Sequence, residues 1–440
     1  MKPRHLFLLS LPSALVALGL GPCTPATDCR FGAGALPVDT LPAGTPHGAA
    51  IPIDHIVVLM QENRSFDHYF DQMFRENAPP ARRLPPLPTN PDPLGGPPIR
   101  AFHQTHVCEV ADLNHGWDGT HNSYDGGKMD GFTAANVDPL DPSGSRTMGY
   151  HDGADLPFYY ALYSTFAMGD RYFASVLGPT YPNRLYLFAA TSFGHIKNDF
   201  PKKGEYAPSI FDRMEDAGVS WRVYFSDLPF TALLARVAST AAKTTTIDNF
   251  FVDAAAGTLP QVSILEPKYF GTVAEESDEH PPSDFQIGQN FVASVVQALF
   301  ESPDWPSTAL FLTYDEHGGY FDHVPPPAAC VPGDKPPMLG PNNVVADFDR
   351  YGIRVPFVVV SPFSKPNFVS HQVHDHSSIT RFIEARFDLP ALTGRDANSN
   401  PPFEFFDFEN PAFMTPPELP DAPIDDSQLA DCQAPPNDGF

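Results

Sequence analysis

The chain has 440 residues, enough to bury a large core, and its 51 Pro and 31 Gly are dispersed among apolar segments, which excludes wholesale disorder. The formal net charge of −26 excludes a basic surface that could follow a nucleic-acid backbone or dock on an anionic membrane by charge alone. A phosphate ester can still bind to such a protein where a local cation inverts the field.

Residues 1–27 predict a secretory signal peptide. Lys2 and Arg4 precede the apolar run 6–20, and small and turn-forming residues follow it. The alternatives are a membrane anchor, for which the run is short, and a lipoprotein site at Cys23, for which the preceding Pro22 is a poor fit. We therefore expect a secreted or periplasmic protein without a later membrane span.

Cysteine usage agrees with an oxidising compartment. If Cys23 lies in or beside the removed segment, four cysteines remain, an even number that allows three pairings. The sequence does not choose among these pairings of Cys29, Cys108, Cys330 and Cys432.

The first predicted element of the core is a buried strand over residues 53–60, because that run is almost continuously apolar. An amphipathic helix follows, with apolar residues at positions 66, 69, 70, 73 and 74 on one face. Glu62 and Asn63 stand between the strand and the helix, where open α/β sheets place active-site groups.

The next segments alternate between helices, strands and loops. Residues 112–131 are expected to form a loop region over the site, 156–166 a helix, and 167–175 a short strand or turn. A helix over 185–190 follows, with Pro182 in its first turn. This places Thr180 at or just before the N-cap, which is an anion-binding position.

Four more strands are predicted at residues 221–225, 261–265, 309–314 and 355–361. A helix with one apolar face lies around 291–300, and Ser377 and Ser378 can cap a helix over 379–387. This alternation favours an α/β fold with a mainly parallel central sheet covered by helices on both faces. No composition break marks a second domain, so we expect a single catalytic domain over 28–440, with a core of about 53–387 and a coil-rich tail from 388.

Two carboxylates, Asp315 and Glu316, follow directly after the apolar strand 309–314. Like charges at close range disfavour double ionisation, so the pair predicts a neighbouring cation. Together with Glu62 and Asn63 they form an oxygen-ligand set for a hard divalent ion, calcium, magnesium or manganese rather than zinc. The alternative is that these residues are ordinary loop acids.

Thr180 is the candidate nucleophile, because a threonine hydroxyl can be activated by a metal ion. The alternative is an ordinary helix cap. Ser65 is a competing hydroxyl that we expect to cap its own helix. Several histidines could donate protons or bind phosphoryl oxygens, or act as structural hydrogen-bond partners: His115, His280, His317 and His323.

Four stretches carry a resemblance to a known family. They are Gln61–Phe70, Gly178–Arg184, Asp278–Pro281 and Thr313–Pro327. With them the chain resembles the bacterial phosphoesterase family of phospholipases C and acid phosphatases, in the alkaline-phosphatase-like superfamily.

The resemblance implies a metal held at Glu62, Asn63, Asp315 and Glu316, a nucleophile at Thr180, and His115 and His280 in contact with the phosphoryl group. Substrate contacts are expected from Asn63, His115, His280 and His317. Threonine rather than serine at 180 is more similar to the phospholipase branch. Tyr181 departs from the Asp or His of many relatives. Large haemolytic members carry extra C-terminal domains, and we expect this chain to end soon after the catalytic fold, which favours ester hydrolysis over action on intact membranes.

The function expected from the sequence is a secreted, metal-dependent phosphoric ester hydrolase. It is a phospholipase C that forms diacylglycerol and a phosphorylated headgroup through a phospho-threonine intermediate. One alternative is an acid phosphatase that acts on small phosphomonoesters, and another is an inactive secreted metal-binding module. The expected partners are a phospholipid or small phosphate ester, with no nucleic acid and at most peripheral membrane contact. The oligomeric state stays open.

Overall fold

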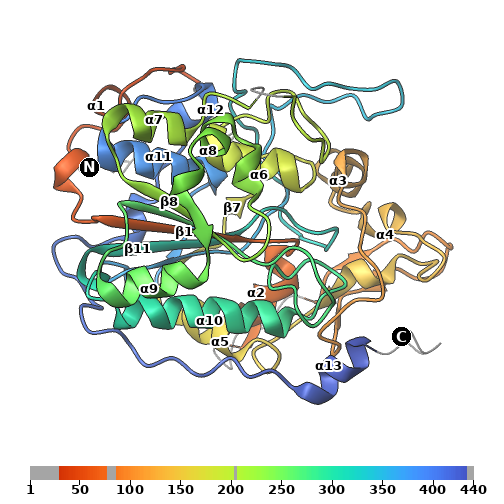
Figure 1. Ribbon diagram of the computed structural model, residues 1–440. Coiled ribbons are helices and arrows are strands. Elements are labelled where there is room, and N and C mark those ends of the chain that lie inside the picture. The colour runs from red at the N-terminus through yellow and green to blue at the C-terminus, as the bar shows by residue number, and fades with distance from the viewer. Residues whose placement is uncertain (1–28, 77–85, 203–205, 434–440) are drawn as a thin grey trace, which may run out of the picture.

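The computed structural model describes residues 29–76, 86–202 and 206–433. The predicted signal peptide over 1–27 lies outside the described residues. An eight-stranded sheet forms the centre of the molecule (Figure 1). Its strands are, from one edge to the other, β13 (Val369–Ser370), β6 (Ala167–Gly169), β12 (Phe357–Val360), β11 (Thr308–Tyr314), β1 (His55–Gln61), β10 (Val262–Glu266), β8 (Trp221–Phe225) and β9 (Thr244–Thr246).

The sheet is mainly parallel, as predicted. β1 pairs in parallel with β10 and β11, and β8 pairs in parallel with β10 and β9. The exception is β12, which runs antiparallel to both of its neighbours, β11 and β6. A mixed sheet of this kind is common when an α/β fold adds strands beyond its parallel part.

Helices cover both faces of the sheet (Figure 1). One layer holds α6 (Thr180–Ala189), α7 (Ile210–Ala217), α8 (Ala235–Ser239) and α11 (His376–Phe387), and the other holds α2 (Phe66–Glu76), α5 (Pro157–Thr165), α9 (Asp248–Ala256) and α10 (Phe285–Glu301). Within the described residues, no helix has both the length and the apolar character needed to cross a membrane.

Short elements lie outside these layers. The small strand pairs are β2 (Thr89–Asn90) with β3 (Ile99–Arg100), β4 (Phe102–His103) with β5 (Gly149–Tyr150), and β7 (Tyr172–Phe173) with β14 (His374–Asp375). The remaining helices are α1 (Pro37–Thr40), α3 (Trp117–Tyr124), α4 (Phe132–Ala135), α12 (Gly394–Ala397) and α13 (Asp426–Gln433).

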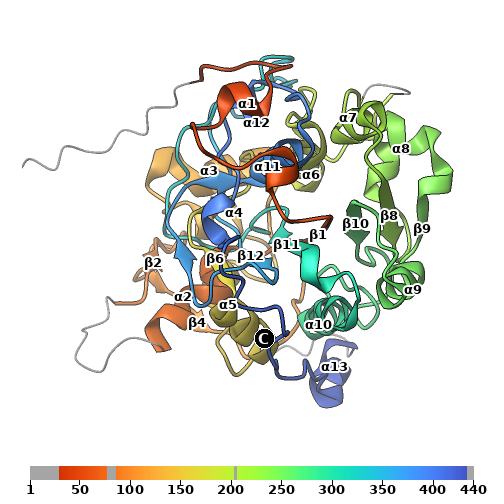
Figure 2. The ribbon, with the colours of Figure 1, turned by 90° about the vertical axis from the view of Figure 1, so that its left-hand side faces the viewer.

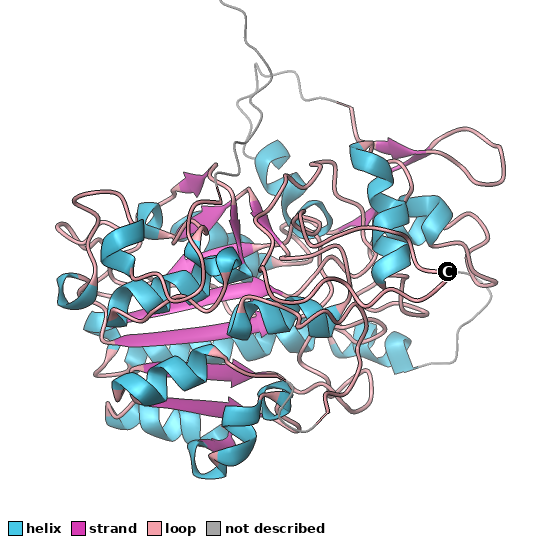
Figure 3. Cartoon of the chain, turned by 90° about the horizontal axis from the view of Figure 1, so that it is seen from above, coloured by secondary structure: helices cyan, strands magenta, loops and turns pink. Residues whose placement is uncertain are grey.

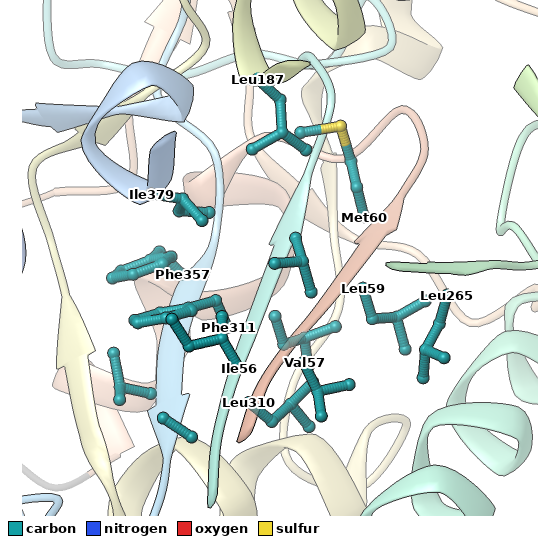
Figure 4. Packing of buried hydrophobic residues seen from close by; sticks show 14 of the residues in the cluster. Ile56, Val57, Leu59, Met60, Leu187, Leu265, Leu310, Phe311, Phe357 and Ile379 are labelled. Carbon is teal, nitrogen blue, oxygen red and sulfur yellow. The ribbon is translucent and has the colours of Figure 1, made fainter. Parts of the chain in front are cut away.

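The core lies on both faces of β1 and β11. Ile56 and Val57 point to opposite faces of β1, and neither side chain is exposed. Leu310 and Phe311 do the same on the neighbouring strand (Figure 4). This burial on both faces explains why the two strands read as unbroken apolar runs.

Two predicted segments differ from the structure. Residues 112–131 were expected to be loop, but they contain α3, which is held by tertiary contacts: the Trp117 indole donates to Val344 O at 2.9 Å, and Asp118 accepts from Val344 N at 2.6 Å. At α11 the N-cap is Asp375 rather than Ser377 or Ser378, because Asp375 and Ser378 form a reciprocal capping box.

The tail from residue 388 is mostly coil, as predicted, with the short helices α12 and α13 added. It runs beside α10, where Asn290 donates to Ala422 O and Gln286 accepts from Asp425 N (Figure 2). Two disulfides, Cys29–Cys330 and Cys108–Cys432, join both ends of the described chain to its interior. The even number of paired cysteines predicted from the sequence is therefore confirmed.

Candidate active site

The carboxyl ends of β1 and β11 lie side by side, which brings the two predicted ligand pairs together. The strand register pairs Gln61 with Tyr314, the last residues of their strands. Beyond this point the chains stay joined, because Asp315 N donates to Gln61 O at 3.0 Å and Arg64 N donates to Glu316 O at 3.1 Å. Figure 3 shows that loops crowd the same edge of the sheet, past the arrowheads of the long strands.

The approach of the two segments depends on Gly318. Its φ is +62°, and a Cβ at this position would lie 2.3 Å from Asn63 O and 2.6 Å from Asn63 Cβ. Asn63 has itself a φ of 61°, a left-handed conformation that asparagine tolerates better than most residues. Glycine at position 318 is thus a steric requirement of the site.

A third segment joins the site through Glu279. Its buried carboxylate accepts hydrogen bonds from Tyr69 at 2.7 Å and Tyr314 at 3.0 Å. Glu62 N donates to Asp278 O at 2.8 Å. These contacts fix the loop that carries Asp278 and His280 next to the end of β1.

Arg184 is the site residue that the sequence analysis missed. Its buried guanidinium lies 3.0 Å from Glu62 Oε1 and 3.4 Å from Asp315 Oδ2. It therefore compensates one carboxylate from each strand end. A usable signal was present, because Arg184 stands four residues after Thr180 and so shares a face of the same helix.

The carboxylates differ in protonation. Burial, and then the charge of Glu62, raise the pKa of Asp315 to about 8. Burial also acts to raise the pKa of Glu316, but the charge and hydrogen bond of His115 outweigh it, and this pKa falls to about 2. Burial is the main reason why the pKa of Glu62 is raised, and Arg184 opposes it. Burial thus disfavours the ionised forms of Asp315 and Glu62, whereas His115 stabilises the ionised form of Glu316.

The predicted ligands fit a hard cation. Both polar atoms of the Asn63 side chain are buried without a hydrogen-bond partner among the described residues, although such atoms are nearly always paired. Asn63 N donates a hydrogen bond to Asp315 Oδ1 at 3.1 Å. The side-chain oxygens of Glu62, Asn63, Asp315 and Glu316 are of the type that calcium, magnesium and manganese prefer. The assignment of these residues as ligands stays a prediction.

A second group of possible ligand atoms adjoins the first. Asp112, His115 and His280 each offer an atom within 4.8 Å of the others. His115 also connects the two groups, because its Nδ1 lies 2.5 Å from Glu316 Oε1 and its Nε2 lies 3.1 Å from Asp112 Oδ2. Burial alone would lower the pKa of His115, but Glu316 and Asp112 raise it well above its usual value.

Thr180 is the first residue of α6, and Pro179 is the N-cap. The prediction that Thr180 is at or before the cap was therefore wrong by one position. Its side chain caps nothing, and no described residue forms a hydrogen bond with its hydroxyl. Ser65, in contrast, accepts from His68 N and donates to Phe321 O, so it caps α2 as expected.

The N-terminus of α6 offers fewer free amides than the sequence suggested. Asn198 accepts a hydrogen bond from Tyr181 N at 2.8 Å, and Pro182 has no N–H. Asn183 holds the preceding loop, with its amide donating to Gly178 O and Pro179 O. These contacts hold the loop before α6 and occupy one of its first amides, and anion binding at this helix end stays a prediction.

The histidines separate into different environments. The rings of His115 and His280 lie 5.8 Å apart, and His280 Nδ1 contacts Pro281 O at 2.6 Å. His317 is 1% exposed and contacts Glu316, so it is buried beside a predicted ligand rather than on a cavity wall. His323 pairs with Asp67 at 2.6 Å.

A cavity of about 450 Å³ opens over Thr180. Its polar end holds Thr180, Glu62, Arg184, Asp278 and His280. Apart from Asn198, the rest of its wall is apolar or aromatic and includes Tyr181, Phe200, Leu228, Phe230, Leu233, Tyr269 and Phe270. The Thr180 hydroxyl, Glu62 with its partner Arg184, and His280 thus face a space large enough for a small organic molecule.

Comparison with known proteins agrees with this chemistry. The profile of the Phosphoesterase family matches residues 53–390. The chain is similar to non-specific phospholipase C1 of Arabidopsis thaliana, with 32% identity over 424 residues, which cover 88% of this chain and 79% of the relative. It is also similar to phospholipase C B of Mycobacterium tuberculosis, with 32% identity over 481 residues, which cover 95% and 88%.

Among solved structures, a protein of the alkaline phosphatase superfamily from Vibrio parahaemolyticus covers 79% of this chain and 69% of its own, with a TM-score of 0.38 and 10% identity. A likeness this distant bears on none of the individual site residues. The extent of the family match and the sequence identities decide the assignment. The chain belongs to the Phosphoesterase family and is a phosphoric ester hydrolase.

Proposed function

We propose that this protein is a phospholipase C that cleaves the bond between phosphate and diacylglycerol, with Thr180 as the nucleophile. The observation that carries the proposal is the unpartnered hydroxyl of Thr180 in one cavity with Glu62, Arg184 and His280. The apolar remainder of the cavity wall favours a lipid ester over a small polar monoester. The names of the relatives support the same substrate class.

The reaction has two displacements. In the first, Thr180 Oγ1 attacks phosphorus, the bond from phosphorus to the glycerol oxygen breaks, and diacylglycerol leaves. The phosphorylated headgroup is then esterified to Thr180. In the second, water attacks the same phosphorus and releases the phosphorylated headgroup, which restores the hydroxyl of Thr180.

His280 is the proposed proton donor to the leaving oxygen. It lines the cavity together with Thr180, and its Nδ1 is occupied by Pro281 O, so Nε2 is the nitrogen left for the substrate. Asp112 Oδ2 lies 3.8 Å from Nε2. His115, held between Glu316 and Asp112, adds positive charge beside the phosphoryl group.

Glu62, Asn63, Asp315 and Glu316 would hold a divalent metal ion, of which calcium, magnesium and manganese are the best matches to oxygen ligands. Such an ion, when bound, lowers the pKa of a neighbouring hydroxyl and balances charge on phosphoryl oxygens. Arg184 keeps two of the four ligands in place through its contacts with Glu62 and Asp315.

We also propose that the protein works outside the cytoplasm, secreted or periplasmic, as one catalytic domain over residues 28–440. The two disulfides support an oxidising compartment. The single central sheet, together with the disulfide that joins the tail at Cys432 to Cys108, supports one domain.

Substitution of Thr180 tests the proposal. Thr180→Ala should lower turnover of phosphatidylcholine by roughly 1,000-fold or more, because the nucleophile is gone. Thr180→Ser is the matched control, since it keeps the hydroxyl, and should stay active. Circular dichroism and metal content should equal those of the wild type in both variants. Near-full activity of Thr180→Ala would remove Thr180 as the nucleophile.

A substrate panel separates the alternatives. Release of diacylglycerol from phosphatidylcholine supports the phospholipase. Hydrolysis of p-nitrophenyl phosphate without lipid cleavage would instead identify an acid phosphatase, and bound metal without hydrolysis of any ester would identify an inactive module.

A further inference from the structure

Three of the most exposed large apolar side chains surround the cavity that contains Thr180. Phe200, Leu228 and Phe270 are 78%, 62% and 61% exposed, and all three line this cavity. A single exposed apolar side chain needs no explanation, but three around one opening form a patch of the kind that marks a binding surface.

The three side chains come from separate loops that are tied together. Leu228 follows β8 and Phe270 follows β10, and Asp227 joins these loops by accepting from Leu228 N at 2.6 Å and from Phe270 N at 2.8 Å. Phe200 packs edge-on against Tyr181, with ring centroids 6.3 Å apart. Hydrogen bonds and a ring contact therefore hold the segments that carry these apolar side chains in place.

The apolar character continues from the opening into the cavity. Phe230 and Leu233 line the same wall, and Tyr181 bridges the outer and inner parts because its ring also lies 5.1 Å from that of Phe230. An acyl-glycerol group that enters between Phe200 and Leu228 would thus stay in apolar contact until its phosphate reaches Thr180.

Charges beside this surface suit a zwitterionic lipid layer. The whole chain carries −26, which disfavours anionic membranes. Phe200 stands between the exposed Lys197 and Lys202 in sequence and directly follows the exposed Asp199, so charges of both signs border it. Aromatic side chains flanked by lysines are typical of segments that lie at the boundary between headgroups and acyl chains.

We infer that Phe200, Leu228 and Phe270 form an interfacial docking surface, which inserts into the surface of a zwitterionic phospholipid aggregate and aligns the cavity with a lipid in that layer. This inference rests on the proposed phospholipase function. It adds that the enzyme prefers aggregated over monomeric substrate, and it assigns that preference to three side chains outside the reacting centre.

The test compares two triple variants. Phe200→Ser, Leu228→Ser and Phe270→Ser together remove the docking surface. The matched control is Leu94→Ser, Val252→Ser and Val345→Ser, which changes side chains that are 68%, 63% and 88% exposed and do not line the cavity. Each protein is assayed on dioleoylphosphatidylcholine vesicles and on monomeric p-nitrophenyl phosphorylcholine, and vesicle binding is measured by co-sedimentation in a Thr180→Ala background.

The docking-surface variant should lose at least about tenfold in vesicle binding and in the ratio of vesicle to monomer activity, because binding scales with buried apolar area. The control should match the wild type. Unchanged vesicle binding, or an equal loss on both substrates, would overturn the inference. A change in the sedimentation of the protein alone, without a change in vesicle binding, would overturn it too. That result would identify the three side chains as a self-association surface. If the wild type cleaves neither substrate, the proposed function itself fails.

Discussion

Thr180 and Arg184 are neighbours on one helix but differ in how many partners their side chains have. Thr180 has a hydroxyl without a partner among the described residues, whereas Arg184 is committed to Glu62, Asp315 and Tyr269. A buried carboxylate that loses its counter-charge costs about 3–5 kcal/mol. Arg184 is therefore needed for the carboxylates to remain in place whether or not it touches substrate.

A pH-dependent contribution to stability is expected from His323. Its hydrogen bond to Asp67 raises the pKa of His323 from 6.5 to about 9. Burial acts to raise the pKa of Asp67, but Arg354 and then His323 lower it. Because the histidine pKa is higher in the folded state, its stabilisation is fully present below about pH 6.5 and is lost as the pH rises through about 9.

His323→Gln should therefore lower the melting temperature relative to the wild type at pH 6, and the two proteins should converge near pH 10. Thermal unfolding followed by circular dichroism across this range measures the difference. A difference that stays constant with pH would show that the charge of His323 does not contribute.

At this scale the sequence predicts the oxygen ligands and Thr180 but not Arg184. The candidate ligands are recognisable because each pair directly follows an apolar strand. Arg184 follows no apolar strand and its partners Glu62 and Asp315 are far away in the sequence, so only its spacing of four residues from Thr180 could have indicated it. Asn198, whose side-chain oxygen accepts a hydrogen bond from Tyr181 N, was also missed, because this contact joins residues 17 positions apart and leaves no pattern in the sequence.

Among the elements, the junction of β1 and β11 decides the geometry of the site. The parallel register places both strand ends at one level, and Gly318 then allows the following turns to meet. The close contact is with the backbone of Asn63, which cannot move aside without displacing a predicted ligand.

Gly318→Ala should lower the free energy of unfolding by about 1–3 kcal/mol more than Gly218→Ala, and should reduce metal content and activity. Gly218 is a matched control, because its φ of +70° resembles the +62° of Gly318 while a Cβ there would meet nothing within 4 Å. Urea unfolding and metal analysis of both variants measure the effect. Equal losses in the two would mean that backbone conformation alone, and not the contact with Asn63, explains Gly318.

Elements with strong local patterns were predicted well, and those held by distant contacts were not. β1, β11 and α2 follow directly from their apolar periodicity. The antiparallel direction of β12 leaves no trace in its apolar run, since burial on both faces looks the same in either direction. α3 has a weak pattern with an internal Gly119, and its contacts with Val344 override its low propensity.

The molecule as a whole is stabilised by long covalent connections. Cys29–Cys330 and Cys108–Cys432 span 301 and 324 residues of sequence. The sequence predicted four paired cysteines but not the pairing, because the pairing depends on where the chain ends return to the core.

Replacing both cysteines of one bridge, Cys108→Ser with Cys432→Ser, should lower the free energy of unfolding by about 2–5 kcal/mol. Guanidinium chloride unfolding with and without a reducing agent measures this difference. The reduced wild type should have a lower free energy of unfolding than the oxidised double variant, because reduction breaks both bridges. Identical unfolding of oxidised and reduced wild type would contradict a stabilising role for the disulfides.

The most direct test of the account is to trap the covalent intermediate. Wild-type protein is mixed with p-nitrophenyl phosphorylcholine, quenched in acid within the first turnover, digested and examined by mass spectrometry. The account predicts a phosphorylated headgroup on the peptide that contains Thr180, and none in the Thr180→Ala variant. Full product release with no modified Thr180 at any quench time, or a modification on another residue, would contradict it.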